Sequence, residues 1–132
     1  MKRSFLILIL LAVVSVANAD LILTLNGVDA AKEPLEIKGK DNLVIAVASQ
    51  AQVDANDYSI TSSGGTLKAH TGGYLFTFED ELSVGSVSLI ANNDMVIDSI
   101  SVVAGGTIYK FVLFYNPETD IVIAFGINLE SL

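Results

Sequence analysis

The chain has 132 residues, of which 52% are hydrophobic and 17% charged, so it is long enough for one domain with a buried core and too apolar to be disordered. Its 7 basic and 15 acidic residues give a formal net charge of −8, which opposes binding to nucleic-acid phosphates. The absence of cysteine excludes disulfides, thiolate nucleophiles and cysteine-ligated zinc.

Residues 1–19 have the pattern of a cleaved signal peptide. Two basic residues near the start are followed by an unbroken apolar run over residues 5–14 and by Ala17-Asn18-Ala19, whose small residues suit a signal peptidase. A transmembrane anchor is the alternative, but a spanning helix needs about 20 apolar residues and this run is shorter. We therefore expect the mature chain, residues 20–132, to be secreted to the extracellular space, the cell surface or the periplasm, without membrane insertion.

Two features of the exported chain favour a bacterial protein. A secreted chain without disulfides must be stabilised by packing alone, which is commoner in bacteria than in small secreted eukaryotic domains. None of the asparagines lies in an N-x-S/T glycosylation sequon. Because two basic residues leave with the leader, the net charge of the mature chain falls from −8 to −10.

Apolar and polar residues alternate with a period of two along the mature chain, which is typical of half-buried strands. Turn signals separate the apolar runs, among them Asn26-Gly27 and Asn116-Pro117. In chain order the predicted strands cover residues 21–26, 35–38, 43–48, 58–61, 67–70, 74–79, 84–89, 95–103, 108–115 and 121–128. The only helical candidate, residues 28–32, is too short to form a stable helix.

Three segments carry more specific expectations. Residues 43–48 are continuously apolar, as expected of a strand covered on both faces. Residues 108–115 and 121–128 predict a hairpin that is also buried on both faces. Gly85 interrupts the strand at 84–89 and predicts a bulge or bend.

Nine or ten short strands with turns at close spacing predict an all-β sandwich or barrel in a single domain. Several strands carry large apolar residues on one face and Ser, Thr or Lys on the other, which favours the sandwich. The expected fold is therefore a single antiparallel β-sandwich of about nine strands over residues 20–132.

Three segments resemble parts of cohesin-type domains. KGKDNLVIAVAS at residues 38–49 resembles their polar turn and buried strand, and FTFEDELSVGSVSL at 76–89 resembles their aromatic strand and its continuation. NPETDIVIAFG at 116–126 resembles a later turn and strand. The resemblance covers residues 35–127 and implies a cohesin-like or immunoglobulin-like sandwich of bacterial surface proteins, where such domains accompany dockerins or sorting tails. It identifies no contact residue.

Two polar clusters are candidate metal sites. Asp54, Asn56 and Asp57 place three oxygen ligands within four residues, and calcium prefers such hard donors in irregular loops. The cluster lacks the spacing and terminal glutamate of an EF-hand, and Asp and Asn are also ordinary turn formers. Asn92-Asn93-Asp94 is a second cluster of the same kind. Calcium is the only cofactor that we expect.

No set of residues predicts catalysis. Glu79-Asp80-Glu81 has the carboxylates that a glycosidase needs, but adjacent residues at a strand end point in different directions, which favours a solvated turn. His70 is the only imidazole, and the chain has no G-x-S-x-G elbow for a serine triad. We therefore expect His70 to lie on the surface and the protein to have no enzymatic activity.

Tyr74, Phe76 and Phe78 form one aromatic face of a predicted strand. They predict either a platform for sugar rings or, more simply, a stripe that faces the core. The expected function is a non-catalytic extracellular module for binding or surface assembly, which recognises another secreted or surface protein or a polysaccharide. The alternative is a structural subunit that polymerises by β-strand addition at an open edge.

Overall fold

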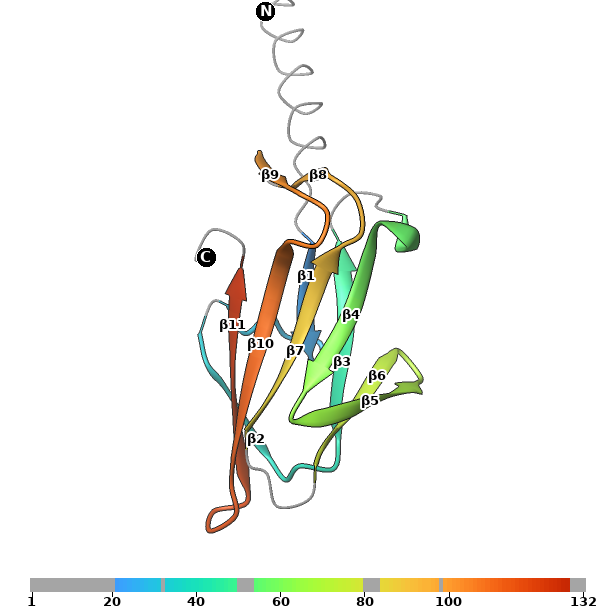
Figure 1. The fold of residues 1–132 in the computed structure, drawn as a ribbon. Helices are drawn as coiled ribbons and strands as arrows, with labels where there is room; N and C mark the ends of the chain where they lie inside the picture. The colour runs from blue at the N-terminus through green and yellow to red at the C-terminus, as the bar shows by residue number, and fades with distance from the viewer. Residues whose placement is uncertain (1–20, 32, 50–53, 80–83, 98, 129–132) are drawn as a thin grey trace, which may run out of the picture.

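The computed structural model describes residues 21–31, 33–49, 54–79, 84–97 and 99–128, so the predicted signal peptide lies outside the described residues. Within these ranges the fold is all-β, with eleven strands and one short 3-10 turn, η1 (Ala55–Asp57). Two antiparallel sheets pack face to face in a sandwich-like arrangement, and the prediction of an all-β two-layer fold is confirmed (Figure 1). No helix in the described part of the chain has the length and apolarity needed to cross a membrane.

The first sheet has four strands in the order β1-β3-β6-β5. Their bounds are Leu21–Leu25 for β1, Leu43–Ser49 for β3, Gly73–Phe78 for β6 and Gly65–His70 for β5. The sequence predicted each of these strands within a few residues. All pairs in this sheet are antiparallel. The strand order makes β1 and β5 its edges.

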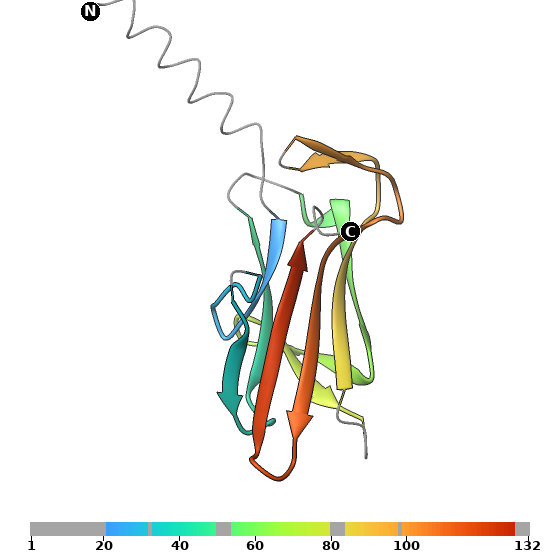
Figure 2. The ribbon, with the colours of Figure 1, turned by 90° about the vertical axis from the view of Figure 1, so that its left-hand side faces the viewer.

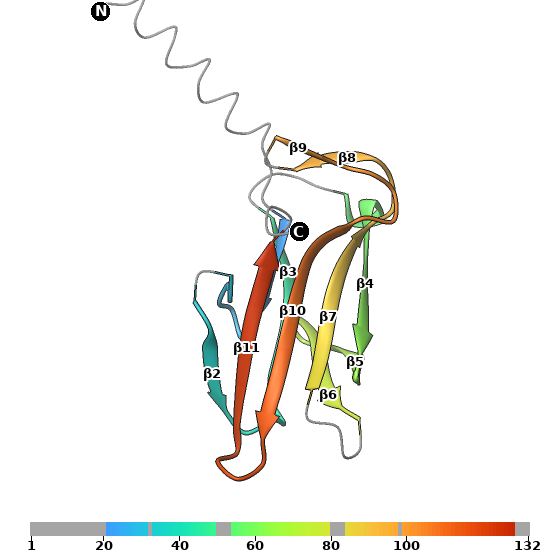
Figure 3. The same ribbon diagram turned by 60° about the vertical axis from the view of Figure 1, so that its left-hand side comes forward.

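The second sheet has five strands in the order β2-β11-β10-β7-β4, which lie side by side in Figure 3. Their bounds are Leu35–Lys38 for β2, Ile121–Asn128 for β11, Thr107–Asn116 for β10, Val84–Ala91 for β7 and Tyr58–Ser63 for β4. The two sheets together hold nine strands. An additional hairpin of β8 (Met95–Ile97) and β9 (Ile100–Val102) lies at the end of the sandwich opposite the β10–β11 turn (Figure 2).

The hairpin of β8 and β9 corrects the prediction of one strand over residues 95–103. The chain reverses between the two halves of that segment, where Ser99 has a positive φ of 67°. The buried positions Ile97 and Val102 differ in parity, so the two halves of the segment do not share one alternation, as a continuous strand requires.

The predicted turn at Asn26-Gly27 is confirmed. Both residues have positive φ, 52° and 86°, as a two-residue hairpin turn requires, and Leu25 and Val28 exchange backbone hydrogen bonds across them at 2.9 and 3.1 Å. The Asn26 side chain also accepts a hydrogen bond from the Val44 amide at 2.9 Å, which ties the turn to β3.

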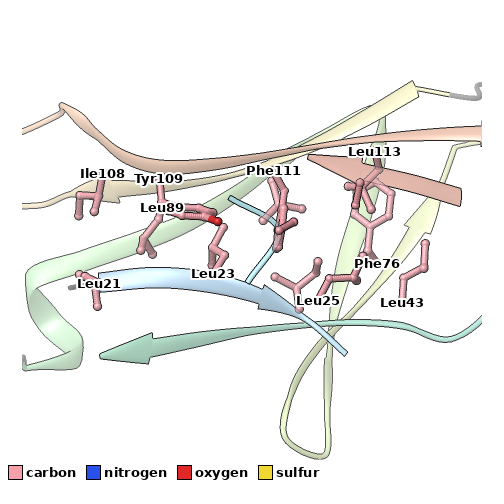
Figure 4. Packing of buried hydrophobic residues seen from close by; sticks show 14 of the residues in the cluster. Leu21, Leu23, Leu25, Leu43, Phe76, Leu89, Ile108, Tyr109, Phe111 and Leu113 are labelled. Atoms are coloured by element: carbon pink, nitrogen blue, oxygen red, sulfur yellow. The ribbon is translucent and has the colours of Figure 1, made fainter. Parts of the chain in front are cut away.

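The core lies between the two sheets. Side chains of β1 and β10 point toward one another across it in Figure 4. Its largest fully buried side chains are Tyr109, Phe76, Phe111, Leu23, Leu25, Leu43, Ile45, Leu89, Ile108 and Leu113. Edge-to-face contacts order the aromatic rings, with centroids 5.7 Å apart for Tyr109 and Phe111.

Gly85 makes room for a ring, and the bulge that was one of the two predictions for this position is absent. Its pairing with Leu113 of β10 is in continuous register. A Cβ at Gly85 would lie 2.5 Å from the Phe76 ring, and one at Gly65 would overlap the same ring. The register shift of this sheet lies instead between Thr107 and Tyr109 in β10.

Candidate functional site

The predicted calcium loop forms a capped turn. Asp54 precedes η1, and its side-chain Oδ1 accepts a hydrogen bond from the Asn56 amide at 3.0 Å. The Asp57 amide donates to the Asp54 carbonyl at 2.9 Å. Asp54 and Asn56 are exposed and Asp57 is half-buried. Asp commonly closes a turn on its own backbone in this way.

The structure brings the second polar cluster against the first. Asn92 donates its side-chain Nδ2 to the Asn56 carbonyl and its backbone N–H to the Asp57 carbonyl, both at 2.9 Å. Ser59 Oγ donates to Asn92 Oδ1 at 2.7 Å. The two clusters are neighbours because they adjoin β4 and β7, which pair in the second sheet. Sequence spacing alone could not show this juxtaposition.

These hydrogen bonds restrict what the loop offers to a metal. The carbonyls of Asp54, Asn56 and Asp57 each accept a hydrogen bond already, so a calcium ion would share them with N–H donors or recruit water. Among the described residues no group of three or more Asp, Glu, His or Cys is placed to hold a metal ion. Calcium binding by Asp54, Asn56 and Asp57 stays a prediction.

Two other candidate groups lie apart from this loop. Glu79 is exposed at the end of β6 and donates its backbone N–H to the Gly64 carbonyl at 3.0 Å, whereas Asp80 and Glu81 lie outside the described residues. His70 is exposed at the end of β5, with Nδ1 3.0 Å from the Thr71 carbonyl. The structure places His70 next to a backbone oxygen at a strand end.

The aromatic stripe of β6 faces the core. Phe76 and Phe78 are buried and meet edge to face with centroids 5.1 Å apart, while Tyr74 is half-buried. Two of the three rings are therefore packing residues, and the stripe is not a platform for sugar rings.

A different aromatic pair is exposed, on the outer face of the second sheet. Phe114 of β10 and Phe125 of β11 are 42% and 39% exposed, and their rings meet edge to face with centroids 5.9 Å apart. The prediction that this hairpin is buried on both faces is wrong. Its outer face exposes two aromatic rings, which the prediction missed.

The reason lies in the residues that β11 turns inward. Val122 and Ala124 are buried, so Ile123 and Phe125 lie on the opposite face. At the next inward position a Cβ on Gly126 would overlap the Tyr109 hydroxyl. Because large side chains of β10 fill the interior here, β11 can supply only small ones, and its larger residues face outward.

We name this surface the outer-sheet patch. It consists of Val84, Val112, Phe114, Ile121, Ile123 and Phe125, which lie on the outer side of β7, β10 and β11. In the register of the sheet Phe114 lies opposite Ile123 and Val112 opposite Phe125. One signal in the sequence could have found it: both alternating faces of 121–128 carry apolar residues, and a sandwich strand has only one core face.

A small cavity adjoins the patch at the β10–β11 turn. It has a volume of about 200 Å³, and its lining includes Phe114, Ile121 and Ile123 together with the polar residues Glu36 and Asn116. Apolar walls with a few polar groups are typical of binding sites, although most ligand pockets are larger, about 300–1,000 Å³.

Interactions among the neighbouring turns hold this end of the sheet. Tyr115 donates its hydroxyl to Asp120 Oδ1 at 2.7 Å, and Lys40 Nζ lies 5.0 Å from the Tyr115 ring centroid. Lys38 Nζ donates to the Thr119 carbonyl at 3.2 Å. The hydrogen bond to Asp120 raises the pKa of the Tyr115 hydroxyl.

Charge is segregated between strands and loops. Among the described strand residues Glu36 is the only carboxylate, whereas Lys38, Lys68 and Lys110 are all on strands. The other described carboxylates lie in loops and turns and are Asp29, Glu33, Asp41, Asp54, Asp57, Glu79, Asp94, Glu118 and Asp120. The outer-sheet patch therefore lies on a face that carries Lys38, Lys110 and Glu36 in an otherwise acidic molecule.

Comparison with known proteins found no family model, no curated protein and no solved structure that matches this chain.

Proposed function

We propose that this chain is a non-catalytic extracellular module for binding or surface assembly, which contacts its partner through the outer-sheet patch. One observation carries the proposal: Phe114 and Phe125 lie exposed beside half-buried Ile121 and Ile123 on a strand face. Contiguous exposed apolar surface of this kind marks interaction sites in soluble proteins. The partner is another secreted or surface protein, or a polysaccharide.

The predicted export signal and the aromatic residues of the patch support this assignment. The predicted leader directs the chain out of the cytoplasm. Because the chain has no cysteine, packing alone must stabilise it outside the cell. Aromatic residues are enriched in the buried centres of protein interfaces, and aromatic faces also pack on sugar rings. The cohesin-like segments quoted above support a place among bacterial surface proteins.

The test compares binding by two variants of the secreted chain. Phe114→Ser/Phe125→Ser removes both rings from the patch, and Val103→Ser removes a side chain that is 66% exposed and outside the patch. Each purified protein is incubated with washed cell envelopes and with insoluble cellulose, chitin and peptidoglycan. We expect binding by the wild type and by Val103→Ser, and at least about tenfold weaker binding by the double variant. Equal binding by all three proteins would refute the patch as the binding surface.

The alternative, polymerisation by strand addition, is favoured by one feature of β4. This edge strand of six residues has neither a charged residue nor a proline, the usual protections of an exposed edge. Thr61→Lys adds a charge to this edge strand, so it would reduce polymers seen by electron microscopy if the strand recruits another chain. Polymers that persist in Thr61→Lys would exclude β4 as the recruiting edge.

A further inference from the structure

We infer that the outer-sheet patch binds a second copy of this chain, so that two sandwiches associate face to face. The inference rests on the proposed function, since it names the partner of the same surface. It is carried by the distribution of charge, by the mixed charges around the patch and by the size of the face.

The distribution of charge favours a sheet face over the loops as the contact surface. The mature chain carries −10, and its described carboxylates lie almost entirely in loops and turns. Two copies that meet through their end loops bring like charges together, which opposes association. Two copies that meet through the outer face of the second sheet keep most of those carboxylates at the periphery.

The patch is also self-complementary in charge. Glu36 and Lys38 lie on the same side of β2, and Lys110 lies on the outer side of β10, so both signs flank the apolar centre. A two-fold interface places the same surface on both sides, so a face with one sign of charge repels itself, whereas a face with both signs can pair with itself.

The face is close to the lower limit of size for a specific dimer interface. β11 has eight residues, and a strand of that length spans about 27 Å; five strands about 4.8 Å apart span roughly 20–24 Å. Because β2 and β4 are shorter than β11, each copy offers at most roughly 600 Å², and two such faces bury about 1,200 Å², the lower end of the range for specific interfaces.

The outer face of the first sheet is a weaker candidate. Its apolar residues, such as Ile22, Val44 and Leu75, are half-buried, and none of the large hydrophobic residues that are more than a third exposed lies on it. The second sheet carries three of those residues, Val84, Phe114 and Phe125.

Size-exclusion chromatography with light scattering tests the inference on the purified secreted chain, from about 1 to about 100 µM. We expect twice the monomer mass for the wild type and for Val103→Ser, and the monomer mass for Phe114→Ser/Phe125→Ser. A thermal melting curve of the double variant is the control for folding, and we expect a cooperative transition. A wild-type monomer at every concentration, or a dimer that persists in the double variant, overturns the inference.

Cross-linking tests whether the two faces meet. The chain has no cysteine, so one introduced thiol is unique. Ser86→Cys places it on β7 beside the patch, and Thr77→Cys places it on the outer face of the first sheet, at an exposed position. We expect a flexible bismaleimide to link Ser86→Cys into dimers and to leave Thr77→Cys monomeric. The opposite result overturns the inference.

Failure of the inference is distinguishable from failure of the proposed function. A monomeric wild type whose binding to envelopes or polysaccharides is lost in Phe114→Ser/Phe125→Ser refutes self-association and leaves the patch as a binding surface. A dimer that is insensitive to the double variant, together with unchanged binding, refutes both.

Discussion

At the scale of single residues, the core depends on glycines that leave space for rings. Phe76 packs between Gly65 and Gly85, and Tyr109 packs against Gly126. In each case the glycine and the ring lie on different strands, so the sequence around the glycine does not show which ring it contacts. A glycine in a strand therefore signals a close approach as readily as a bulge.

Gly85→Ala is expected to destabilise the fold. The added Cβ would lie 2.5 Å from the Phe76 ring in a packed interior, which predicts a loss of about 1–3 kcal/mol in the free energy of unfolding, measured by urea denaturation. In a Phe76→Leu background the penalty shrinks, because the ring is gone. The same penalty in both backgrounds would contradict a clash with Phe76.

The buried residue Tyr109 forms a hydrogen bond that links the two sheets. Its hydroxyl donates to Asp29 Oδ1 at 2.5 Å, and the same oxygen accepts a hydrogen bond from the Ala31 amide at 2.9 Å. Burial and the hydrogen bond to Asp29 raise the pKa of Tyr109 far above its usual value. The loop after β1 is thereby attached to β10 of the other sheet.

Tyr109→Phe is expected to cost about 1–2 kcal/mol at neutral pH, because the hydrogen bond to Asp29 is lost. The pKa of Tyr109 is higher in the folded than in the unfolded state, so the stabilisation is complete below the unfolded value of about 10 and is lost as pH rises above it. Urea midpoints of wild type and Tyr109→Phe should therefore converge above pH 10. Parallel curves would contradict the raised pKa.

At the scale of elements, the turn before β4 and the end of β7 form one hydrogen-bonded junction. Asn92 forms hydrogen bonds with Ser59, Asn56 and Asp57. The predicted calcium site at this junction therefore has a definite structural alternative, which is a turn closed by its own side chains.

Melting curves separate calcium binding from a plain turn. Two carboxylates predict a weak site with Kd of about 10⁻⁴–10⁻³ M, so about 10 mM calcium should stabilise the fold by about 1.4–2.7 kcal/mol and raise the melting temperature over that in EDTA. Magnesium should do less, because it requires tighter geometry. Asp54→Asn/Asp57→Asn keeps side chains that can close the turn and should abolish the shift. Equal melting temperatures in EDTA, calcium and magnesium would leave the loop as a turn.

The β10–β11 hairpin shows how packing assigns the faces of an element. Both alternating sets of β11 are apolar, and only the set with Val122 and Ala124 is buried. Tyr109 on the neighbouring strand β10 fills the space beside Gly126, so β11 keeps its small residues inward and Phe125 outward.

At the scale of the whole molecule, the acidic charge and the apolar faces are separated in space. Apart from Glu36, the described carboxylates lie in loops and turns, whereas Lys38, Lys68 and Lys110 lie on strands. This separation leaves the outer face of the second sheet with Glu36 as its only described strand carboxylate. The proposed binding function and the inferred dimer both depend on this separation.

The sequence by itself determined the two-layer all-β fold, because a period of two and frequent turn residues exclude helices of useful length. It also determined a local feature whose cause is local, the Asn26-Gly27 turn, which needs two positive φ angles. The tertiary structure alone decided the rest. Strand pairing brought Asn92 to Asn56, and the packing of Tyr109 beside Gly126 left Phe125 on the outer face. Both depend on contacts between segments far apart in the chain, which no local pattern encodes.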